Sequence, residues 1–194
     1  MKKIVLASGS PRRKELLKSI GVKFTVLITD TDESTVPQQL DPGLYVRELA
    51  ILKANSAAKK AGSHALVIGA DTIVCHNGKI LGKPADGHEA CEMLRSLSDD
   101  VHSVYTGIAV LDTDMMKIVS QYEKTQVSFR KLTDKEIENY VKKYYPTDKA
   151  GAYGIQEFAA VFADRIEGDY YNIVGLPLCR LYTLIVNEFG EEIS

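Results

Sequence analysis

Apolar segments alternate with helical segments along the whole chain, and this alternation constrains the fold more than any other feature of the sequence. Strands are predicted at residues 3–7, 24–28, 65–75, 79–82, 101–111, 117–130, 160–166 and 170–174. Helices are predicted at residues 11–20, 42–61, 86–97, 133–145 and 177–189. Interleaved strands and helices indicate an α/β fold in which helices flank a twisted sheet.

The turns between these segments indicate how the strands pair. Asn77-Gly78 is the strongest short hairpin signal, because both residues readily adopt the positive φ that a tight turn needs. It joins 65–75 to 79–82, so these two strands must be antiparallel. A polar turn at 112–114 joins 101–111 to 117–130 in the same way. We therefore predict a mixed sheet.

The starts of two helices are also marked. Ser10-Pro11 and Asp41-Pro42 each place a capping residue immediately before a proline. Proline is favoured at the first helical position because its missing N–H would have no partner there, and the preceding hydroxyl or carboxylate can accept from the backbone. These signals predict helices that begin at Pro11 and Pro42.

The chain has 194 residues, which is enough for one domain over residues 1–194 or for a compact two-lobed unit. Its 45% hydrophobic and 26% charged fractions exclude an intrinsically disordered protein. The 24 Lys and Arg residues against 26 Asp and Glu give a net charge of −2. This balance argues against sequence-independent binding to nucleic acid, which needs a strongly basic domain. A small anionic ligand needs only a few local charges.

The sequence indicates no secretory signal, no membrane span and no zinc cluster. The apolar run 4–7 is too short for a secretory signal, and no run approaches the roughly 20 apolar residues of a membrane span. Cys75, Cys91 and Cys179 are an odd number with no CxxC spacing, so neither a disulfide framework nor a zinc cluster is expected. We expect buried, reduced thiols and a cytoplasmic protein.

The segment 8–14, Ser-Gly-Ser-Pro-Arg-Arg-Lys, is the first candidate binding site. Arg12, Arg13 and Lys14 lie in the first turn of a predicted helix, where the helix dipole disfavours cations. An anion bound there by backbone N–H groups, by the Ser8 hydroxyl and by the guanidinium groups would explain the arrangement. The alternative is a solvated basic turn. The segment is not a Walker A loop, because GxxxxGK[ST] is absent.

Asp71 and two lysines form the second candidate site. Asp71 and Thr72 interrupt an apolar strand, and a carboxylate there must be paired, hydrogen-bonded or bound to a metal. It is either a structural residue at a strand end or a general base or metal ligand. Lys53 interrupts the apolar stripe of helix 42–61, and Lys83 follows the strand paired with that of Asp71. Each lysine can equally extend its amine to solvent.

Two loops complete the candidates. The segment 148–156 contains small residues that allow a close backbone approach, and the Gln156 amide can pair with a base edge. A plain glycine-rich turn is the alternative. The acidic cluster Asp30, Asp32 and Glu33 could hold a divalent cation or simply be solvated.

Taken together, these segments closely resemble the Maf family of nucleoside triphosphate pyrophosphatases, a family associated with bacterial septum formation. They occur in family order over nearly the whole chain, which is far more specific than any single motif. The matching segments are LASGSPRR (6–13), ELL (15–17), DE (32–33), KA (53–54), GADTIV (69–74), GKP (82–84), DKAGAYGIQ (148–156), GDYY (168–171) and VGLP (174–177).

The resemblance implies a single Maf-like domain with two lobes around a central cleft, related to the inosine-triphosphate pyrophosphatase fold. It implies hydrolysis between the α- and β-phosphates of a nucleoside triphosphate, with Mg²⁺ or Mn²⁺. Asp71 matches the family's catalytic carboxylate. Arg12, Thr72 and Gln156 match the positions that divide the family by substrate and resemble the dTTP/UTP branch rather than the branch that acts on methylated GTP.

The resemblance also suggests how the remaining residues would act. Water would attack the α-phosphorus, while Arg13, Lys53 and Lys83, helped by Ser8, would neutralise charge on the triphosphate. Glu33 would be the metal ligand, with Asp71 as a second. An aspartate beside two lysines and a metal ion is a weak base, because nearby cations favour the carboxylate. Asp71 would then act chiefly by positioning water or metal.

One departure and two alternatives accompany this interpretation. The family often continues Gly-Ile-Gln with glycine, whereas Glu157, Phe158 and Ala159 follow Gln156 here. The first alternative is a nucleotide-binding regulatory protein of cell division without turnover, and the second is a pyrophosphatase for other modified nucleotides. The expected partner is a nucleoside triphosphate, with no nucleic acid and no membrane; a homodimer is left open.

Overall fold

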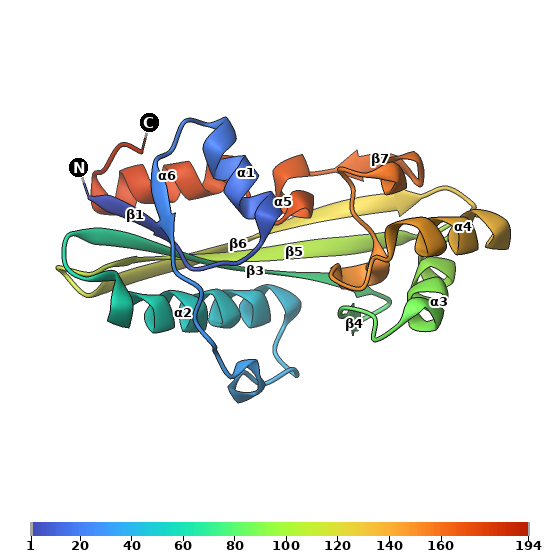
Figure 1. Ribbon diagram of the computed structural model, residues 1–194, viewed down its shortest axis with the longest axis horizontal. Coiled ribbons are helices and arrows are strands. Elements are labelled where there is room, and N and C mark those ends of the chain that lie inside the picture. Colours follow the sequence, from blue (N-terminus) through green and yellow to red (C-terminus); the bar gives the residue numbers. More distant parts are fainter. Residues whose placement is uncertain (1, 194) are drawn as a thin grey trace. The chain divides into compact units, whose positions relative to one another are not determined.

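A mixed seven-stranded sheet with helices beside it organises the chain (Figure 1). The structure, a computed structural model, describes residues 2–193. The strands are β1 (Lys3–Leu6), β2 (Phe24–Val26), β3 (Ala65–His76), β4 (Lys79–Leu81), β5 (Val101–Asp112), β6 (Lys117–Phe129) and β7 (Ala163–Glu167). The helices are α1 (Pro11–Ser19), α2 (Pro42–Ala61), α3 (Gly87–Leu97), α4 (Asp134–Tyr144), α5 (Tyr170–Val174) and α6 (Leu178–Phe189).

The strand order is β2-β1-β3-β5-β6-β7, with β4 paired to β3 outside this path. β1 pairs in parallel with β2 and with β3, so that Ile4 lies opposite Phe24 on one side and Leu66 on the other. β4 pairs antiparallel to β3, and β7 pairs antiparallel to β6. The predicted mixed sheet is therefore confirmed, including the Asn77-Gly78 hairpin.

The chain divides into two compact units. The first contains residues 1–71, 106–123 and 175–194, and the second contains residues 72–105 and 124–174. β3, β5 and β6 each contribute one part to either unit. Among residues 2–193, no helix is both long enough and apolar enough to cross a membrane.

Small residues bring α2 close to the sheet in the first unit. Ala50, Ala54 and Ala57 of α2 are fully buried in a core that they share with residues of β1, β3 and β5. A Cβ atom on Gly69 of β3 would lie 2.2 Å from the Ala50 carbonyl oxygen, so only glycine permits this approach. Gly107 of β5 meets α2 in the same way. The close contact fixes the position of every side chain that α2 directs toward β3.

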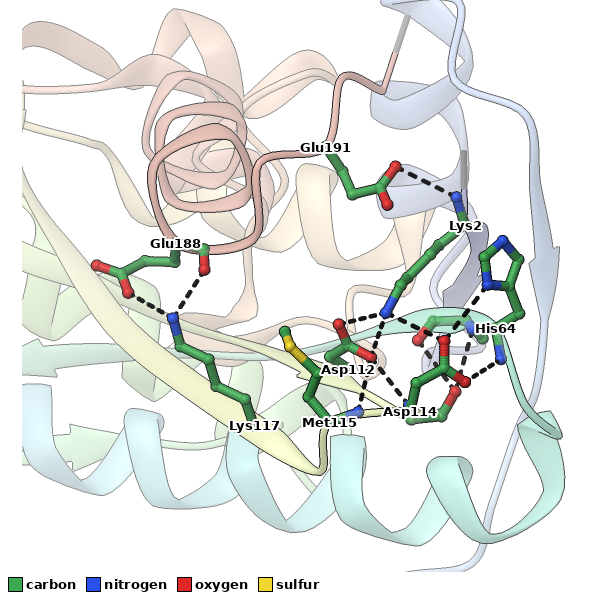
Figure 2. A network of polar contacts seen from close by, with 10 residues as sticks. Lys2, His64, Asp112, Asp114, Met115, Lys117, Glu188 and Glu191 are labelled. Atoms are coloured by element: carbon green, nitrogen blue, oxygen red, sulfur yellow. Dashed lines mark hydrogen bonds and ion pairs between the residues drawn. The ribbon is translucent and has the colours of Figure 1, made fainter.

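Figure 2 shows a polar network within this unit, where the chain enters β1 and leaves β5. The Lys2 ammonium donates to Asp112 Oδ1 at 2.6 Å and lies 3.2 Å from an Asp114 oxygen. Asp112 also accepts from the backbone N–H groups of Asp114 and Met115. Asp114 accepts from the His64 backbone at 2.7 Å. These bonds connect the turn after β5 to the segments that precede β1 and β3.

Aromatic rings fill the core of the second unit. His102, Phe129 and Tyr153 pack edge to face, with ring centroids 4.9–5.4 Å apart. The His102 Nε2 and the Tyr153 hydroxyl lie 2.7 Å apart, and burial lowers the pKa of His102 to about 4. Tyr140 and Phe162 extend the cluster. The ring of His102 is therefore neutral at ordinary pH and belongs to the core.

Two predicted strands are wrong in whole or in part. Residues 170–174 form the short helix α5, because the Asp169 carboxylate accepts from the Tyr171 N–H at 2.8 Å and starts a helical turn. Within the predicted strand 160–166, β7 begins only at Ala163, after a 3₁₀ helix at Phe158–Val161. Aromatic and β-branched residues favour strands, and a local cap outweighs that preference here.

The cysteines also differ from expectation. Cys75 and Cys91 are half-buried and Cys179 is exposed, so the predicted burial of all three thiols is wrong. Cys179 lies on α6, where every third or fourth residue faces the core and the residues between them face outward. Within the part of the chain that the structure describes, the cysteines form no disulfide.

Candidate active site

The turn between β1 and α1 is organised by Ser8. The Ser8 hydroxyl oxygen accepts from the Ser10 backbone N–H at 3.2 Å and from Arg13 Nη1 at 3.1 Å. Ser10 occupies the N-cap position of α1 as predicted, but its side chain makes no capping hydrogen bond. The hydroxyl that fixes the turn therefore belongs to the residue two positions earlier.

Arg13 connects three segments of the first unit. Its Nε donates to the Gly175 carbonyl oxygen at 2.8 Å, and its Nη1 donates to the Ala70 carbonyl oxygen at 3.0 Å as well as to Ser8. Burial lowers the pKa of the Arg13 guanidinium, whereas the nearby Asp71 carboxylate raises it. A guanidinium has five N–H donors. The hydrogen bonds to Ser8, Ala70 and Gly175 therefore hold the positively charged guanidinium of Arg13 near Asp71.

Lys53, Asp71 and Glu33 form an ion-pair cluster in the same unit. The Lys53 ammonium donates to the Asp71 carboxylate and lies 2.8 Å from Glu33 Oε1. The side chains of Lys53 and Asp71 are mostly buried, whereas that of Glu33 is 50% exposed. The structure thus brings together Ser8, Arg13, Lys53, Asp71 and Glu33, which come from four separate parts of the sequence.

Tyr45 is a residue near this cluster that the sequence interpretation missed. It lies on α2, is 8% exposed and shares a side-chain hydrogen bond with Gln38. Burial raises the pKa of its hydroxyl, and the negative charges of Asp71 and Glu33 raise it further. The only sequence signal was a polar-tipped aromatic residue two helical turns before Lys53, on a helix with a buried face.

Asp32 and Glu33, in the acidic segment that precedes α2, have different roles. The Asp32 carboxylate accepts from both the backbone N–H and the hydroxyl of Ser34, at 3.1 and 2.6 Å, and caps a 3₁₀ helix at Glu33–Thr35. These hydrogen bonds lower the pKa of Asp32. Asp32 therefore shapes the loop, and Glu33 is the member of the segment that reaches Lys53.

The remaining predicted site residues are Arg12, Thr72, Lys83 and Gln156. Arg12 is half-buried beside Arg13 in the first turn of α1. Thr72 follows Asp71 along β3 and is half-buried. Lys83 and Gln156 are exposed residues of the second unit. The loops that carry these last two residues are joined, because the Gly151 N–H donates to the Gly82 carbonyl oxygen at 3.1 Å.

Two carboxylates, Glu33 and Asp71, are the oxygen donors of the cluster. Mg²⁺ and Mn²⁺ bind proteins through one or two such groups and leave the other positions to water and substrate phosphates. Among residues 2–193, no group of three or more His, Cys, Asp or Glu side chains could hold a metal by itself. The two carboxylates therefore fit a divalent cation whose remaining ligands are water molecules and substrate phosphate oxygens.

In comparisons with known proteins, one family matches nearly the whole chain. The model of the Maf-like protein family matches residues 3–188. A relative from Clostridium novyi (strain NT), named "dTTP/UTP pyrophosphatase", is 53% identical over 97% of each chain. A relative with the same name from Clostridium botulinum (strain Kyoto / Type A2) is 50% identical over the full length of both chains.

Among solved structures, the Staphylococcus aureus Ham1 protein matches with a TM-score of 0.47 and 19% identity, covering 66% of this chain and 72% of that one.

Proposed function

The chain belongs to the Maf family, and from this premise we propose that it hydrolyses nucleoside triphosphates between the α- and β-phosphates, with dTTP and UTP preferred. The products would be a nucleoside monophosphate and pyrophosphate, and unwanted or modified nucleotides would thereby be removed. The observation that carries the proposal is the cluster of Lys53, Asp71 and Glu33 beside Arg13. Residues 1–194 are proposed to act as one Maf-like domain.

In this proposal, cations bind the triphosphate and Asp71 serves the attacking water. Lys53 and Arg13 would neutralise charge that develops on the phosphates, where oriented cations stabilise the transition state. Ser8 would hold Arg13 in place through the hydrogen bond between them. The Lys53 ammonium donates to the Asp71 carboxylate and holds it in place. Asp71 would therefore position the water and accept its proton as negative charge leaves with pyrophosphate.

A divalent cation completes the proposed chemistry. Glu33 would hold it, with Asp71 as a second ligand, because these two carboxylates lie together at Lys53. Mg²⁺ or Mn²⁺ bound there would offset phosphate charge. The Lys53 ammonium pairs with both carboxylates and is the cation that would neutralise charge on the substrate phosphates.

In this proposal Arg12, Thr72 and Gln156 select the base of the nucleotide. Lys83 would be a further residue that binds the phosphates. An amide side chain offers a donor and an acceptor, which match the N–H and carbonyl groups of thymine and uracil. Relatives about half identical to this chain are named dTTP/UTP pyrophosphatases. We propose that these residues give this chain the same preference.

A nucleotide-binding protein without turnover is the second candidate. The cations of α1 and α2 would serve such a protein equally well. Asp71 argues against it, because a carboxylate beside Lys53 weakens the binding of an anion and brings a site without chemistry no benefit. A pyrophosphatase for other modified nucleotides would share the cluster and differ only in base recognition.

Pyrophosphate release from a panel of nucleoside triphosphates in the presence of Mg²⁺ tests the proposal. Release that is fastest from dTTP and UTP is expected. Release only from purine nucleotides would overturn the assigned preference, and no release from any nucleotide would favour the binding protein. Arg12→Ala should reduce the discrimination among bases while leaving the unfolding transition in place.

A further inference from the structure

The turn that carries Gln156 is held rigidly on its upstream side. The Tyr153 hydroxyl lies 2.7 Å from His102 Nε2 in the buried aromatic core. The Gly154 N–H donates to the Tyr140 hydroxyl at 3.3 Å, and Ile155 is 6% exposed. The chain therefore leaves the core in a fixed direction just before Gln156, which is itself exposed.

Downstream of Gln156 the turn is held by an ion pair. Lys149 is 8% exposed although it carries a charge, and its ammonium lies 3.3 Å from Glu157 Oε1 and 2.8 Å from Asp148 Oδ1. A buried ammonium must keep its carboxylate partners, because leaving it without them is costly. The Glu157 backbone N–H also donates to the Gly154 carbonyl oxygen at 3.0 Å. Glu157 is thus tied to the turn by its main chain and its side chain.

Gly154 is tightly enclosed by this ion pair. A Cβ atom on Gly154 would lie 2.9 Å from Lys149 Cε and 3.2 Å from Glu157 Cδ. The two side chains therefore pass directly over the glycine. The turn, the lysine and the glutamate therefore pack closely against one another.

Phe158 adds an aromatic contact immediately after Glu157. Its ring is stacked on Tyr144 of α4, with centroids 5.8 Å apart and planes 18° from parallel. It also stacks on Tyr140 at 6.5 Å and meets Phe162 edge to face at 6.0 Å. Although Phe158 is 48% exposed, it is held against α4 from one side. Gln156 is consequently fixed between two anchored neighbours, Ile155 and the Glu157-Phe158 pair.

We infer that Glu157 is a positioning residue for nucleotide selection: through Lys149, and with Phe158 stacked on Tyr144, it holds the Gln156 amide in the orientation that reads the base. This inference rests on the proposed function. An amide on a mobile turn loses rotational freedom when it binds, and that cost is removed when the turn is rigid beforehand. Glu157 itself needs no contact with the nucleotide.

Glu157→Gln removes the charge with almost no change in shape, and its side chain is exposed enough for the variant to fold. We expect KM for dTTP and UTP to rise about tenfold, which is 1.4 kcal/mol, with kcat within about twofold. The ratio of kcat/KM for dTTP to that for dCTP should fall by a similar factor. Glu157→Asp, which keeps the charge, should restore part of the loss.

A double-variant comparison separates positioning from a general loss of structure. In a Gln156→Ala background, Glu157→Gln should change KM no further, because the amide that it orients is gone. Glu167→Gln is the matched control: Glu167 pairs with Arg165 on β7, and both side chains are exposed. This control should leave KM and the discrimination ratio unchanged.

The outcomes separate this inference from the proposed function. Turnover by the unmodified protein with an unchanged KM in Glu157→Gln overturns the inference alone. An equal rise in KM with and without Gln156 also overturns it, since the effect would not pass through the amide. Absence of pyrophosphate release by the unmodified protein from every nucleotide overturns the proposed function, and the inference falls with it.

Discussion

Lys53 on α2 donates to the carboxylate of Asp71 on β3, and the two side chains are only 18% and 15% exposed. The contact depends on the close approach of α2 to the sheet, which Gly69 permits two residues before Asp71. A mostly buried ion pair of this kind seldom adds much net stability, because both charges lose their hydration. The presence of two opposite charges at this mostly buried position is therefore better explained by chemistry than by folding.

Replacement of Asp71 by Asn should stop turnover and preserve binding. The amide cannot accept a proton from water, so kcat should fall at least about 100-fold. Binding of dTTP in the absence of divalent metal should be unchanged or tighter, because a negative charge near the phosphates is removed. Pyrophosphate release and titration calorimetry measure the two effects. Asp164→Asn, at an exposed position of β7, is the control and should retain full activity. Undiminished turnover in Asp71→Asn would exclude any chemical role for this carboxylate.

Arg13→Lys should destabilise the first unit. Lysine lacks the fork that lets Arg13 donate to Gly175, Ala70 and Ser8 together, so at least one mostly buried carbonyl loses its partner. A loss of about 1–3 kcal/mol in the free energy of unfolding is expected from urea titration. Arg165→Lys is the matched control, because Arg165 is 72% exposed and should change stability by less than about 0.5 kcal/mol. Equal stability of the two variants would contradict the anchoring role.

Asp112→Asn should weaken the network of Figure 2. Burial raises the pKa of Asp112, but bonds from Lys2 and from two backbone N–H groups outweigh burial and lower the pKa overall. The carboxylate therefore stabilises the fold above its ordinary pKa, and this stability is lost as the pH falls. At pH 7 we expect Asp112→Asn to cost about 1–2 kcal/mol in urea titration. Glu188→Gln, in an exposed pair with Lys117, should cost much less; the reverse order would be inconsistent with the network.

His102 should make stability depend on pH between about 6.5 and 4. Burial lowers its pKa in the folded protein to about 4, whereas an unfolded chain binds the proton near pH 6.5. The unfolded state therefore binds more protons in this window, and the free energy of unfolding falls as the pH falls, by up to about 3 kcal/mol. In urea titrations across this pH window, the free energy of unfolding should change less steeply with pH in His102→Asn than in the unmodified protein. An unchanged slope would mean that His102 binds its proton equally well in the folded and unfolded states, which would contradict the lowered pKa.

Local signals were enough to predict most helices. The Asp41 carboxylate accepts from the Gly43 N–H at 2.9 Å and starts α2 where the sequence indicated. Such caps act over a few residues, so they can be read without knowing the fold. The helix α5 at 170–174 shows the limit, because its cap at Asp169 competes with residues that favour a strand.

The candidate site could be predicted only where residue chemistry was conspicuous. Asp71 and Lys53 each interrupt an apolar pattern, which marked both of them in the sequence. The cluster that they form with Glu33 through Lys53 depends on tertiary structure, because Glu33 and Asp71 lie 38 positions apart in the sequence. Tyr45 gave no such signal, since a tyrosine on a buried helix face is ordinary.

Hydrolysis of dTTP in water labelled with heavy oxygen tests the central claim most directly. Attack at the α-phosphorus places the labelled oxygen in the nucleoside monophosphate, and the pyrophosphate carries none. We predict this pattern for the unmodified protein with Mg²⁺, and no labelled product above background for Asp71→Asn. Label in the pyrophosphate would mean attack at the β-phosphorus, and orthophosphate as the product would mean attack at the γ-phosphorus; either result would contradict the account.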